Sequence, residues 1–388
     1  MSELPKTAGV VIIGGGVIGL AVARALARRG LSDVMLIERG SLGAESSSAA
    51  AGMLAPQAEA DRADEFFHLT RQSRDLYPAF AAALLEETGI DIELDTSGTL
   101  YLAFTDEDVR DLEKRYEWQS KAGLPLEMLR SEDARQLEPA ISENVCAALK
   151  FPLDMQVENR RLISALAASS EKLGVRLVTG TTVTFLKTEH HGVAGVETSR
   201  GFVSTNIVIV AGGAWTSSLG MQTSSGEPAK SMPSFGIEPV RGQMLCFEAN
   251  PQIARHVIYS PRGYIVPRRD GRLLSGSTTE HAGFDRRVTA EGVRSILSAA
   301  LEISPRVGAL PLQASWAGLR PRAADGLPVL GPYAEIEGLF YATGHYRNGI
   351  LLAPITGELI AGVIVDKMDS TSLSIFSPDR FDQVGVNS

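Results

Sequence analysis

The sequence predicts a two-domain α/β protein, with a discontinuous Rossmann-like domain and a second domain built on an antiparallel sheet. Two observations predict this class. A strand, a glycine-rich turn and a helix follow one another near the N-terminus, in the order that opens a dinucleotide-binding unit. Further glycine-rich turns recur near residues 211–215 and 344–349, with strand-like segments between them. The domain that carries these turns must therefore be assembled from several separate segments of chain.

The composition excludes several classes of protein. Of 388 residues, 44% are hydrophobic and 21% are charged, which is typical of a globular chain and not of a disordered one. Lys and Arg number 37 against 46 Asp and Glu, so the net charge of −9 offers no general attraction to nucleic acid or an anionic membrane. The 38 glycines exceed the usual share of about 7%, which indicates close approach of the backbone to a ligand. The apolar run from Ala8 to Ala23 is interrupted by glycines and is shorter than the roughly 20 residues of a membrane span.

The first motif combines a strand over 10–13, the turn Gly14–Gly19 and a helix that ends near Arg29. Gly14 permits the tight turn, Gly16 lets the backbone approach a pyrophosphate, and Gly19 lets helix and strand pack closely. A second strand over 34–37 ends at Glu38, 19 residues after Gly19, close to the spacing of the acid that binds a ribose hydroxyl. The cofactor contacts predicted from this segment are Gly14, Gly16, Val17, Ile18, Gly19, Glu38 and Arg39.

Two later segments extend the predicted cofactor site. The stretch from Ser46 to Leu54 consists of small residues without periodicity, which makes a poor core helix and a good lining for a flat ring or a diphosphate. Strands are expected over 178–185 and 202–210, the second leading into a glycine turn. The contacts predicted here are Ser46, Ser47, Ser48, Ala50, Gly52, Met53, Leu54, Val183, Gly212, Gly213 and Trp215. The fingerprint at 14–19 alone does not separate a nicotinamide from a flavin, but the turn at 211–215 resembles the one by which flavoproteins return to the adenine half of FAD.

The C-terminal third contains the densest group of motifs, and with it the sequence resembles a known family. Gly-Leu-Arg-Pro (318–321) and Gly-His-Tyr-Arg-Asn-Gly-Ile-Leu-Leu (344–352) follow Ser-Ala-Ala-Ala-Gly-Met-Leu (48–54) and Tyr-Ile-Val-Pro-Arg (264–268). From about residue 8 to residue 364, the chain resembles the FAD-dependent D-amino-acid oxidase superfamily and, within it, the glycine oxidases of the thiamine pathway. The resemblance implies FAD as the cofactor and a GR2-type FAD-binding domain roofed by the antiparallel sheet. Noncovalent FAD is expected, because the sarcosine-oxidase branch tethers its flavin through a late cysteine and no cysteine follows Cys246.

The same motifs predict how a substrate is held. An amino-acid carboxylate must be fixed before its α-hydrogen can face a flavin, and the planar fork of arginine can bind both oxygens. By resemblance, Arg320 clamps the carboxylate, Tyr264 donates its hydroxyl to the same group, and Arg347 lines the substrate pocket. The alternatives are ion pairing for the two arginines and strand packing for Tyr264.

The turn ahead of a helix over 350–364 is expected to present unpaired N–H groups to the flavin's pyrimidine edge. The contacts predicted from this turn are His345, Arg347, Asn348, Gly349, Ile350 and Leu351. The resemblance also implies that His345 is not a general base, because the hydride leaves the α-carbon of an amine-deprotonated substrate directly.

Other polar positions either leave alternatives open or indicate ordinary structure. Arg262 either favours a second carboxylate on the substrate or points to solvent, and Thr279 is a second position at the expected rim of the pocket. Cys146 and Cys246 lie in apolar contexts, which predicts buried, reduced thiols. The pair His190-His191 predicts a hairpin turn and not a metal site, because neighbours on a strand point to opposite faces. No metal is expected.

The spread of the motifs predicts the domain boundaries. The FAD-binding domain is expected to comprise residues 1–80, 155–235 and 315–375, the substrate-binding domain residues 81–154 and 236–314, and a C-terminal tail residues 376–388. Helices are predicted over 66–88 and 107–122, and strands over 99–104 and within 244–266. The stretch 222–234 is rich in Ser, Gly and Pro, which indicates a loop or crossover.

The expected function is FAD-dependent oxidative deamination of glycine, and of sarcosine, other N-substituted glycines or small D-amino acids. Hydride transfer to the flavin is expected to give the imine, which hydrolyses to glyoxylate or another keto acid and ammonia or an amine, while dioxygen becomes hydrogen peroxide. The alternatives are a D-amino-acid dehydrogenase with a quinone acceptor, an oxidase of a larger N-carboxymethyl amino acid, a nicotinamide dehydrogenase, and a module whose flavin is structural. A small amine substrate and dioxygen are the expected partners, without nucleic acid or membrane. The two cysteines, expected to be reduced, indicate a cytoplasmic protein. The resemblance suggests a homo-oligomer, in particular a homotetramer.

Overall fold

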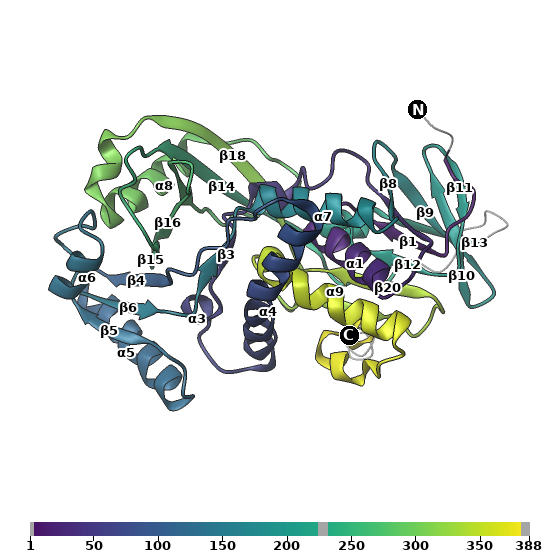
Figure 1. The fold of residues 1–388 in the computed structure, drawn as a ribbon, viewed down its shortest axis with the longest axis horizontal. Coiled ribbons are helices and arrows are strands. Elements are labelled where there is room, and N and C mark those ends of the chain that lie inside the picture. The colour runs from purple at the N-terminus through teal and green to yellow at the C-terminus, as the bar shows by residue number, and fades with distance from the viewer. Residues whose placement is uncertain (1–3, 224–231, 382–388) are drawn as a thin grey trace.

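The computed structural model describes residues 4–223 and 232–381, and Figure 1 shows them arranged in two lobes. Among these residues, a six-stranded sheet forms the centre of one lobe and an eight-stranded sheet the centre of the other, with a four-stranded and a two-stranded sheet in addition. Segments of the two large sheets alternate along the chain. The predicted class, an α/β protein with a discontinuous Rossmann-like domain and a second sheet-based domain, is confirmed.

The six-stranded sheet has helices on one face and strands on the other. Val10 and Ile12 pack towards the helices, whereas Val11 packs into the cluster on the opposite face. Because both faces are buried, the strands read as continuous apolar runs, and a ligand site is expected beyond their carboxyl ends. In spatial order the strands are β19 (Val329–Pro332), β20 (Leu339–Thr343), β12 (Val208–Val210), β1 (Val10–Ile13), β2 (Val34–Ile37) and β8 (Arg176–Val178), all parallel except β19. The helices are α1 (Val17–Arg28), α7 (Asn159–Lys172), α9 (Gly349–Val365) and α4 (Glu65–Thr88), which packs against α7 and α9.

The four-stranded sheet covers the second face of the six-stranded one. Its strands, in spatial order, are β11 (Gly201–Ser204), β10 (Gly192–Thr198), β9 (Val183–Glu189) and β13 (Gly220–Thr223). The strands predicted over 178–185 and 202–210 are wrong in extent, because each prediction joins the ends of strands that belong to different sheets. The chain changes sheet beside Thr205, whose hydroxyl donates to the carbonyl of Gly9. The turn predicted at His190-His191 is confirmed, since these residues connect β9 to β10 and His190 has a φ of 54°.

The eight-stranded sheet positions side chains by simple alternation. Leu245 and Ile265 pack with α8 (Ala290–Ile303), whereas their neighbours Met244 and Tyr264 belong to the cluster on the opposite face. Tyr264 therefore faces away from α8. The order is β18 (Leu312–Arg322), β14 (Glu238–Glu248), β17 (Arg272–Gly276), β16 (Gly263–Pro267), β15 (Val257–Ser260), β4 (Thr99–Ala103), β6 (Ala147–Phe151) and β5 (Glu127–Arg130), antiparallel except for the pair β4 and β15. The helices α5 (Asp106–Lys121) and α6 (Ser131–Leu137) flank its far end (Figure 1).

Several short elements lie where the sequence indicated irregular backbone. The small-residue stretch 46–54 contains the single-turn helix α2 (Ser46–Ala49) and β3 (Met53–Leu54), which pairs with β7 (Met155–Gln156). Other short helices are the single turn α3 (Pro56–Glu59) and the 3₁₀ segments η1 (Gly213–Ser218) and η2 (Pro305–Ala309). Both cysteines are free, but Cys146 is exposed and the prediction of a buried thiol there is wrong. The reason is that its neighbour Val145 is the residue that turns into the core.

The domain boundaries remain predictions, and three of them, after residues 80, 314 and 375, fall inside continuous elements. Residue 80 lies within α4, and residue 315 lies within β18, which pairs along its length with β14 of the eight-stranded sheet. Of the predicted loop 222–234, residues 222–223 end β13 and residues 224–231 lie outside the described part of the chain. The C-terminal end forms η3 (Ser370–Phe376) and η4 (Pro378–Phe381), and residues 382–388 lie outside the description. Within the described ranges no helix has the length and apolar character needed to cross a bilayer.

Candidate active site

A cavity of about 540 Å³ extends from the turn before α1 to the eight-stranded sheet. Distant parts of the chain line it, which explains why the predicted motifs are so widely spaced. Residues from the ranges 13–18, 45–53, 181–185, 210–219 and 342–350 form its wall, together with Tyr264 and Arg320.

The turn before α1 has the geometry that its glycines predicted. Gly14 has a φ of +109°, and a Cβ there would lie 2.4 Å from the carbonyl oxygen of Ala211. A Cβ on Gly19 would lie 2.0 Å from the carbonyl oxygen of Gly14, so this glycine allows α1 to pack against the turn. At Gly16 an added Cβ would meet only Ser47 Oγ, at 3.3 Å, and the residue lines the cavity. The backbone at Gly16 can therefore approach a diphosphate at the N-terminus of the helix, where the dipole favours an anion.

Glu38 stands at the end of β2 on the cavity wall. Its Oε2 accepts the N–H of Gly15 at 2.7 Å, and its Oε1 accepts the N–H of Gly40 at 2.8 Å. Each carboxylate oxygen retains a lone pair, so this position suits a ribose hydroxyl donor. Beyond it, the Arg39 guanidinium lies 3.8 Å from the ring centre of Trp215, and both residues line the same end of the site.

The structure brings most of the predicted cofactor residues to the cavity and leaves four off its wall. Gly19 lies beneath the turn, and Ser48 faces α7, where its carbonyl accepts the side-chain amide of Asn159. Leu54 and Leu351 are 0% and 2% exposed and belong to the hydrophobic core. The predicted residues that line the cavity are Gly14, Gly16, Val17, Ile18, Glu38, Arg39, Ser46, Ser47, Ala50, Gly52, Met53, Val183, Gly212, Gly213, Trp215, Tyr264, Arg320, His345, Arg347, Asn348, Gly349 and Ile350.

Arg320 enters the cavity from β18. Its Nη1 donates to the carbonyl of Thr278 at 3.0 Å, and its Nη2 donates to Ser277 Oγ at 2.8 Å. Both acceptors are neutral, and among the described residues no carboxylate lies within 4.0 Å of the guanidinium. Burial lowers the pKa of Arg320, but an arginine remains charged at any physiological pH. Arg320 is thus a cation without an anionic partner, with N–H groups left to donate into the cavity.

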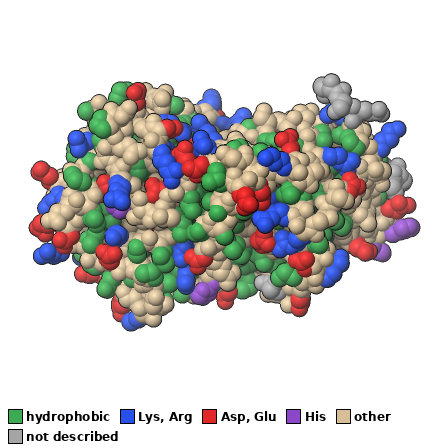
Figure 2. All heavy atoms as spheres, in the orientation of Figure 1, with side chains coloured by type: hydrophobic (Ala, Val, Ile, Leu, Met, Phe, Trp, Pro, Cys, Tyr) green, Lys and Arg blue, Asp and Glu red, His purple; other side chains and the backbone are tan. Residues whose placement is uncertain are grey.

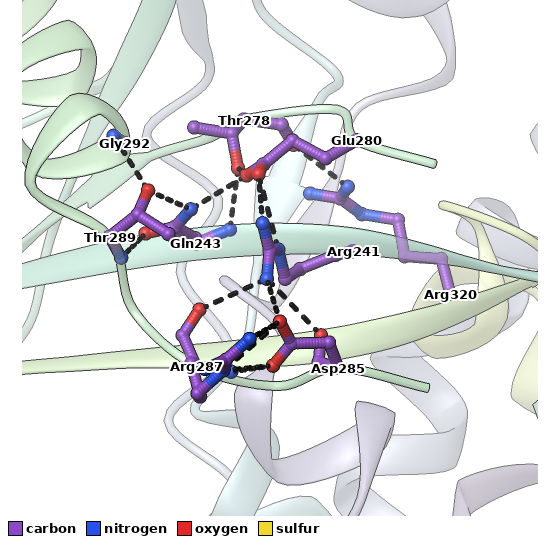
Figure 3. A network of polar contacts seen from close by, with 9 residues as sticks. All are labelled: Arg241, Gln243, Thr278, Glu280, Asp285, Arg287, Thr289, Gly292 and Arg320. Atoms are coloured by element: carbon purple, nitrogen blue, oxygen red, sulfur yellow. Dashed lines mark hydrogen bonds and ion pairs between the residues drawn. The ribbon is translucent and has the colours of Figure 1, made fainter. Parts of the chain in front are cut away.

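Ser277 and Thr278 lie in the loop that follows β17, and the acidic residue of this loop, Glu280, forms an ion pair with Arg241 (Figure 3). Glu280 accepts hydrogen bonds from Arg241 Nε at 3.1 Å and from Gln243 Nε2 at 2.7 Å. Burial acts to raise the pKa of Glu280, but the hydrogen bonds from Arg241 and its neighbours outweigh it and lower the pKa. Because Glu280 also binds the Thr278 hydroxyl, the network holds the loop that carries the acceptors of Arg320. The charge of Glu280 is therefore compensated by Arg241, and that of Arg320 remains uncompensated.

Tyr264 lies beside Arg320 in the same cavity and is 6% exposed. Its hydroxyl donates to Met244 Sδ at 3.3 Å. A thioether sulfur is a weak acceptor, so a bound carboxylate would replace it as the partner of this hydroxyl. Gly242 on β14 provides the room for the arginine, because a Cβ there would lie 2.2 Å from Arg320 Nη2. Together, Arg320 and Tyr264 form an anion-binding end to the cavity.

A second cavity of about 710 Å³ joins the first, and Tyr264, Ser277, Arg347, Asn348 and Glu59 line both. Arg347 Nη2 lies 3.6 Å from Glu59 Oε1, and this carboxylate raises the pKa of Arg347. Thr279 and Arg262 also line the second cavity. The Arg262 side chain is 40% exposed, and its guanidinium forms ion pairs with Asp108 at 2.9 Å and Glu302 at 2.5 Å, so its charge is compensated within the protein.

His345 is 3% exposed and lies at the start of the turn that leads into α9. Its Nε2 is 3.0 Å from Thr356 Oγ1, and burial lowers the pKa of His345 to about 3. An imidazole with this pKa stays neutral at physiological pH and is a poor proton acceptor. The prediction that His345 is not a general base accords with this environment.

Residues of the site that were not singled out from the sequence include Glu59, Gly242, Met244 and Ser277. Gly242 carried a recognisable signal, since a glycine inside a strand often marks close approach of a ligand or another group. Glu59 follows Pro56, which opens a one-turn helix at its first position. Met244 and Ser277 carried no such signal, because their places depend on how β14, β16 and β17 pair.

A Rossmann-like sheet, a dinucleotide-sized cavity and an anion-binding end define a dinucleotide-dependent oxidoreductase. The family described as FAD dependent oxidoreductase matches residues 9–363, and the chain belongs to this family. The cofactor is accordingly FAD, and the open face of Gly16, the Glu38 carboxylate and the continuous cavity fit it.

Individual relatives cover nearly the whole chain. The glycine oxidase of Geobacillus kaustophilus (strain HTA426) is 38% identical over 380 residues, which are 97% of this chain and 98% of that protein. The crystal structure of glycine oxidase from Geobacillus kaustophilus superposes with a TM-score of 0.90 and covers 97% of this chain and 99% of that one. The bifunctional protein ThiO/ThiG of Trichormus variabilis is 36% identical over 97% of this chain, which spans 55% of that longer protein.

Proposed function

We propose that this protein oxidises glycine and small related amines, including sarcosine, other N-substituted glycines and small D-amino acids, to their imines. The observation that carries the proposal is Arg320, a cation without a carboxylate partner at the end of the FAD cavity. A carboxylate ligand would restore the balance of charge, and Tyr264 offers it a further donor. The similarity to glycine oxidases over almost the full chain supports the same substrate class.

The residues of the site would bind and orient the substrate. Arg320 and Tyr264 hold the carboxylate, so that the α-carbon projects towards the part of the cavity lined by residues 342–350. When bound, FAD supplies the acceptor for the hydride of the α-carbon and passes the electrons to dioxygen, which gives hydrogen peroxide. Hydrolysis of the released imine yields glyoxylate and ammonia from glycine. No side chain need remove a proton from carbon, which accords with the neutral, enclosed His345.

Acidic and basic side chains are interspersed over the face seen in Figure 2. With a net charge of −9, the chain as a whole does not attract an anion, so the substrate must be captured locally by Arg320.

We further propose noncovalent FAD and a cytoplasmic homo-oligomer, which the similarity to glycine oxidases and the two free thiols support. The likeness to ThiO/ThiG supports a role in a thiamine pathway, where the imine itself would pass to thiazole assembly.

Anaerobic and aerobic assays with glycine test the proposal. Purified holoenzyme mixed with glycine under anaerobic conditions should lose the yellow colour of oxidised flavin, and in air it should form peroxide and glyoxylate in equal amounts. If neither bleaching nor peroxide is observed, glycine oxidation is excluded. Bleaching that dyes or quinones reverse rapidly, and dioxygen only slowly, would instead identify a dehydrogenase.

A further inference from the structure

Glu59 occupies the junction of the two cavities, at the end of the single turn α3 between the lobes (Figure 1). Its Oε1 accepts the hydroxyl of Tyr259 at 2.9 Å and lies 3.6 Å from Arg347 Nη2. The side chain is 25% exposed, so part of the carboxylate faces the open space. A ligand that reaches from the flavin side into the second cavity passes the residues that line both, and Glu59 is the one carboxylate among them.

Buried polar groups hold the α3 backbone in place. The N–H groups of Gln57 and Ala58 donate to Asp154 at 3.4 and 3.1 Å, and the carbonyl of Gln57 accepts Gln119 Nε2 at 2.8 Å. The carbonyl of Ala58 accepts the Arg115 guanidinium. Gln57, Gln119 and Asp154 are 0% exposed. The position of Glu59 is therefore built into the fold and is not that of a free surface side chain.

The charged side chains around the second cavity form ion pairs, and the pair at the junction is that of Glu59 and Arg347. On its outer wall Asp61 pairs with Arg115 at 3.0 Å, and Asp64 pairs with Arg62 at 2.8 Å. At the junction, Arg347 is the one cation among the described residues within 4.0 Å of Glu59. The pair Glu59 and Arg347 thus sets the local potential where a substrate's N-substituent would lie.

We propose that Glu59 is a specificity-determining residue, which keeps Arg347 from acting as a second carboxylate clamp. The proposal rests on the proposed function, because it concerns the substituent on the nitrogen of a glycine held by Arg320. In the native protein Arg347 is compensated, so N-substituents that are neutral or cationic enter the second cavity, and those that bear a carboxylate are disfavoured. Without the charge of Glu59, Arg347 becomes a free cation like Arg320 and accepts the second carboxylate.

The substitution Glu59→Gln keeps the shape of the side chain and removes its charge. We expect the ratio of kcat/KM for iminodiacetate to that for sarcosine to rise by about tenfold or more, as expected when a repulsion between like charges is removed. The double variant Glu59→Gln/Arg347→Gln should lose this gain, because the gain requires the freed guanidinium. The control Glu127→Gln makes the same chemical change at a carboxylate that pairs with Lys150 outside both cavities, and it should leave the ratio unchanged.

A binding measurement separates recognition from chemistry. Diglycolate and methoxyacetate are the ether counterparts of the two substrates and have no amine to oxidise, so their dissociation constants can be read from the flavin absorption spectrum. Glu59→Gln should strengthen the binding of diglycolate relative to that of methoxyacetate by about tenfold or more. Unchanged ratios in a variant that retains FAD overturn the inference, and Glu59→Ala provides the same test if the glutamine variant fails to fold. A wild-type enzyme that cannot oxidise glycine at all would instead refute the proposed function.

Discussion

Removal of the Arg320 guanidinium should separate substrate binding from cofactor binding. The side chain uses two of its five N–H groups on Thr278 and Ser277, which leaves three for a carboxylate. Two charge-assisted hydrogen bonds to the substrate contribute about 1.5–3 kcal/mol each, so Arg320→Ala should weaken glycine binding by roughly 100-fold to 10,000-fold. Arg320→Lys retains the positive charge but not the planar guanidinium that binds both carboxylate oxygens, and it should weaken glycine binding by about 10-fold to 100-fold.

Anaerobic flavin reduction at varied glycine concentration measures this effect directly. The concentration dependence gives the dissociation constant, the plateau gives the rate of reduction, and the flavin spectrum reports bound FAD. Glycinamide, which lacks the carboxylate, provides an internal comparison, because Arg320→Ala should abolish the preference for glycine over glycinamide. The control Arg322→Ala lies on the same strand, pairs with Glu238 at 3.1 Å outside the cavity, and should behave as wild type. An Arg320→Ala variant that retains FAD and binds glycine normally would refute the assignment of the carboxylate clamp.

Three further substitutions test the remaining parts of the argument. Gly242→Ala places a Cβ 2.2 Å from Arg320 Nη2, so it should raise the glycine KM by about 10-fold or more while thermal unfolding of the FAD complex changes little. Gly16→Ala meets only one hydroxyl of the protein, so equilibrium dialysis should show weaker FAD binding with little change in the unfolding of the FAD-free chain. Burial raises the pKa of Asp154 from 3.8 to about 7, so the folded chain keeps a proton that the unfolded chain releases. Its contribution to stability is complete below pH 3.8 and falls as the pH rises, by about 2 kcal/mol from pH 5 to 6.5 relative to Asp154→Asn in urea unfolding.

The parts of the fold that follow from local sequence were predictable. The turn at Gly14–Gly19 requires a positive φ and a close backbone contact, and both requirements act between neighbours in the chain. Tyr264 follows the same logic, because an alternating strand with Ile265 under a helix must turn Tyr264 to the other face. The divided strand over 202–210 was not predictable, since its two halves are equally apolar and join sheets that only the tertiary structure distinguishes.

The site shows the same limit more sharply, because the role of an arginine depends on its partner and not on its neighbours in sequence. Arg241, Arg320 and Arg347 all reach the same region from different strands and turns. Arg241 is matched by Glu280, and Arg347 by Glu59, whereas Arg320 meets only neutral acceptors. These pairings join residues 39, 288 and 42 positions apart, a separation at which sequence spacing carries no information. Arg320 is therefore an uncompensated cation that a substrate carboxylate can pair with. The substitution of Glu59 tests whether removing the partner of Arg347 creates a second such cation.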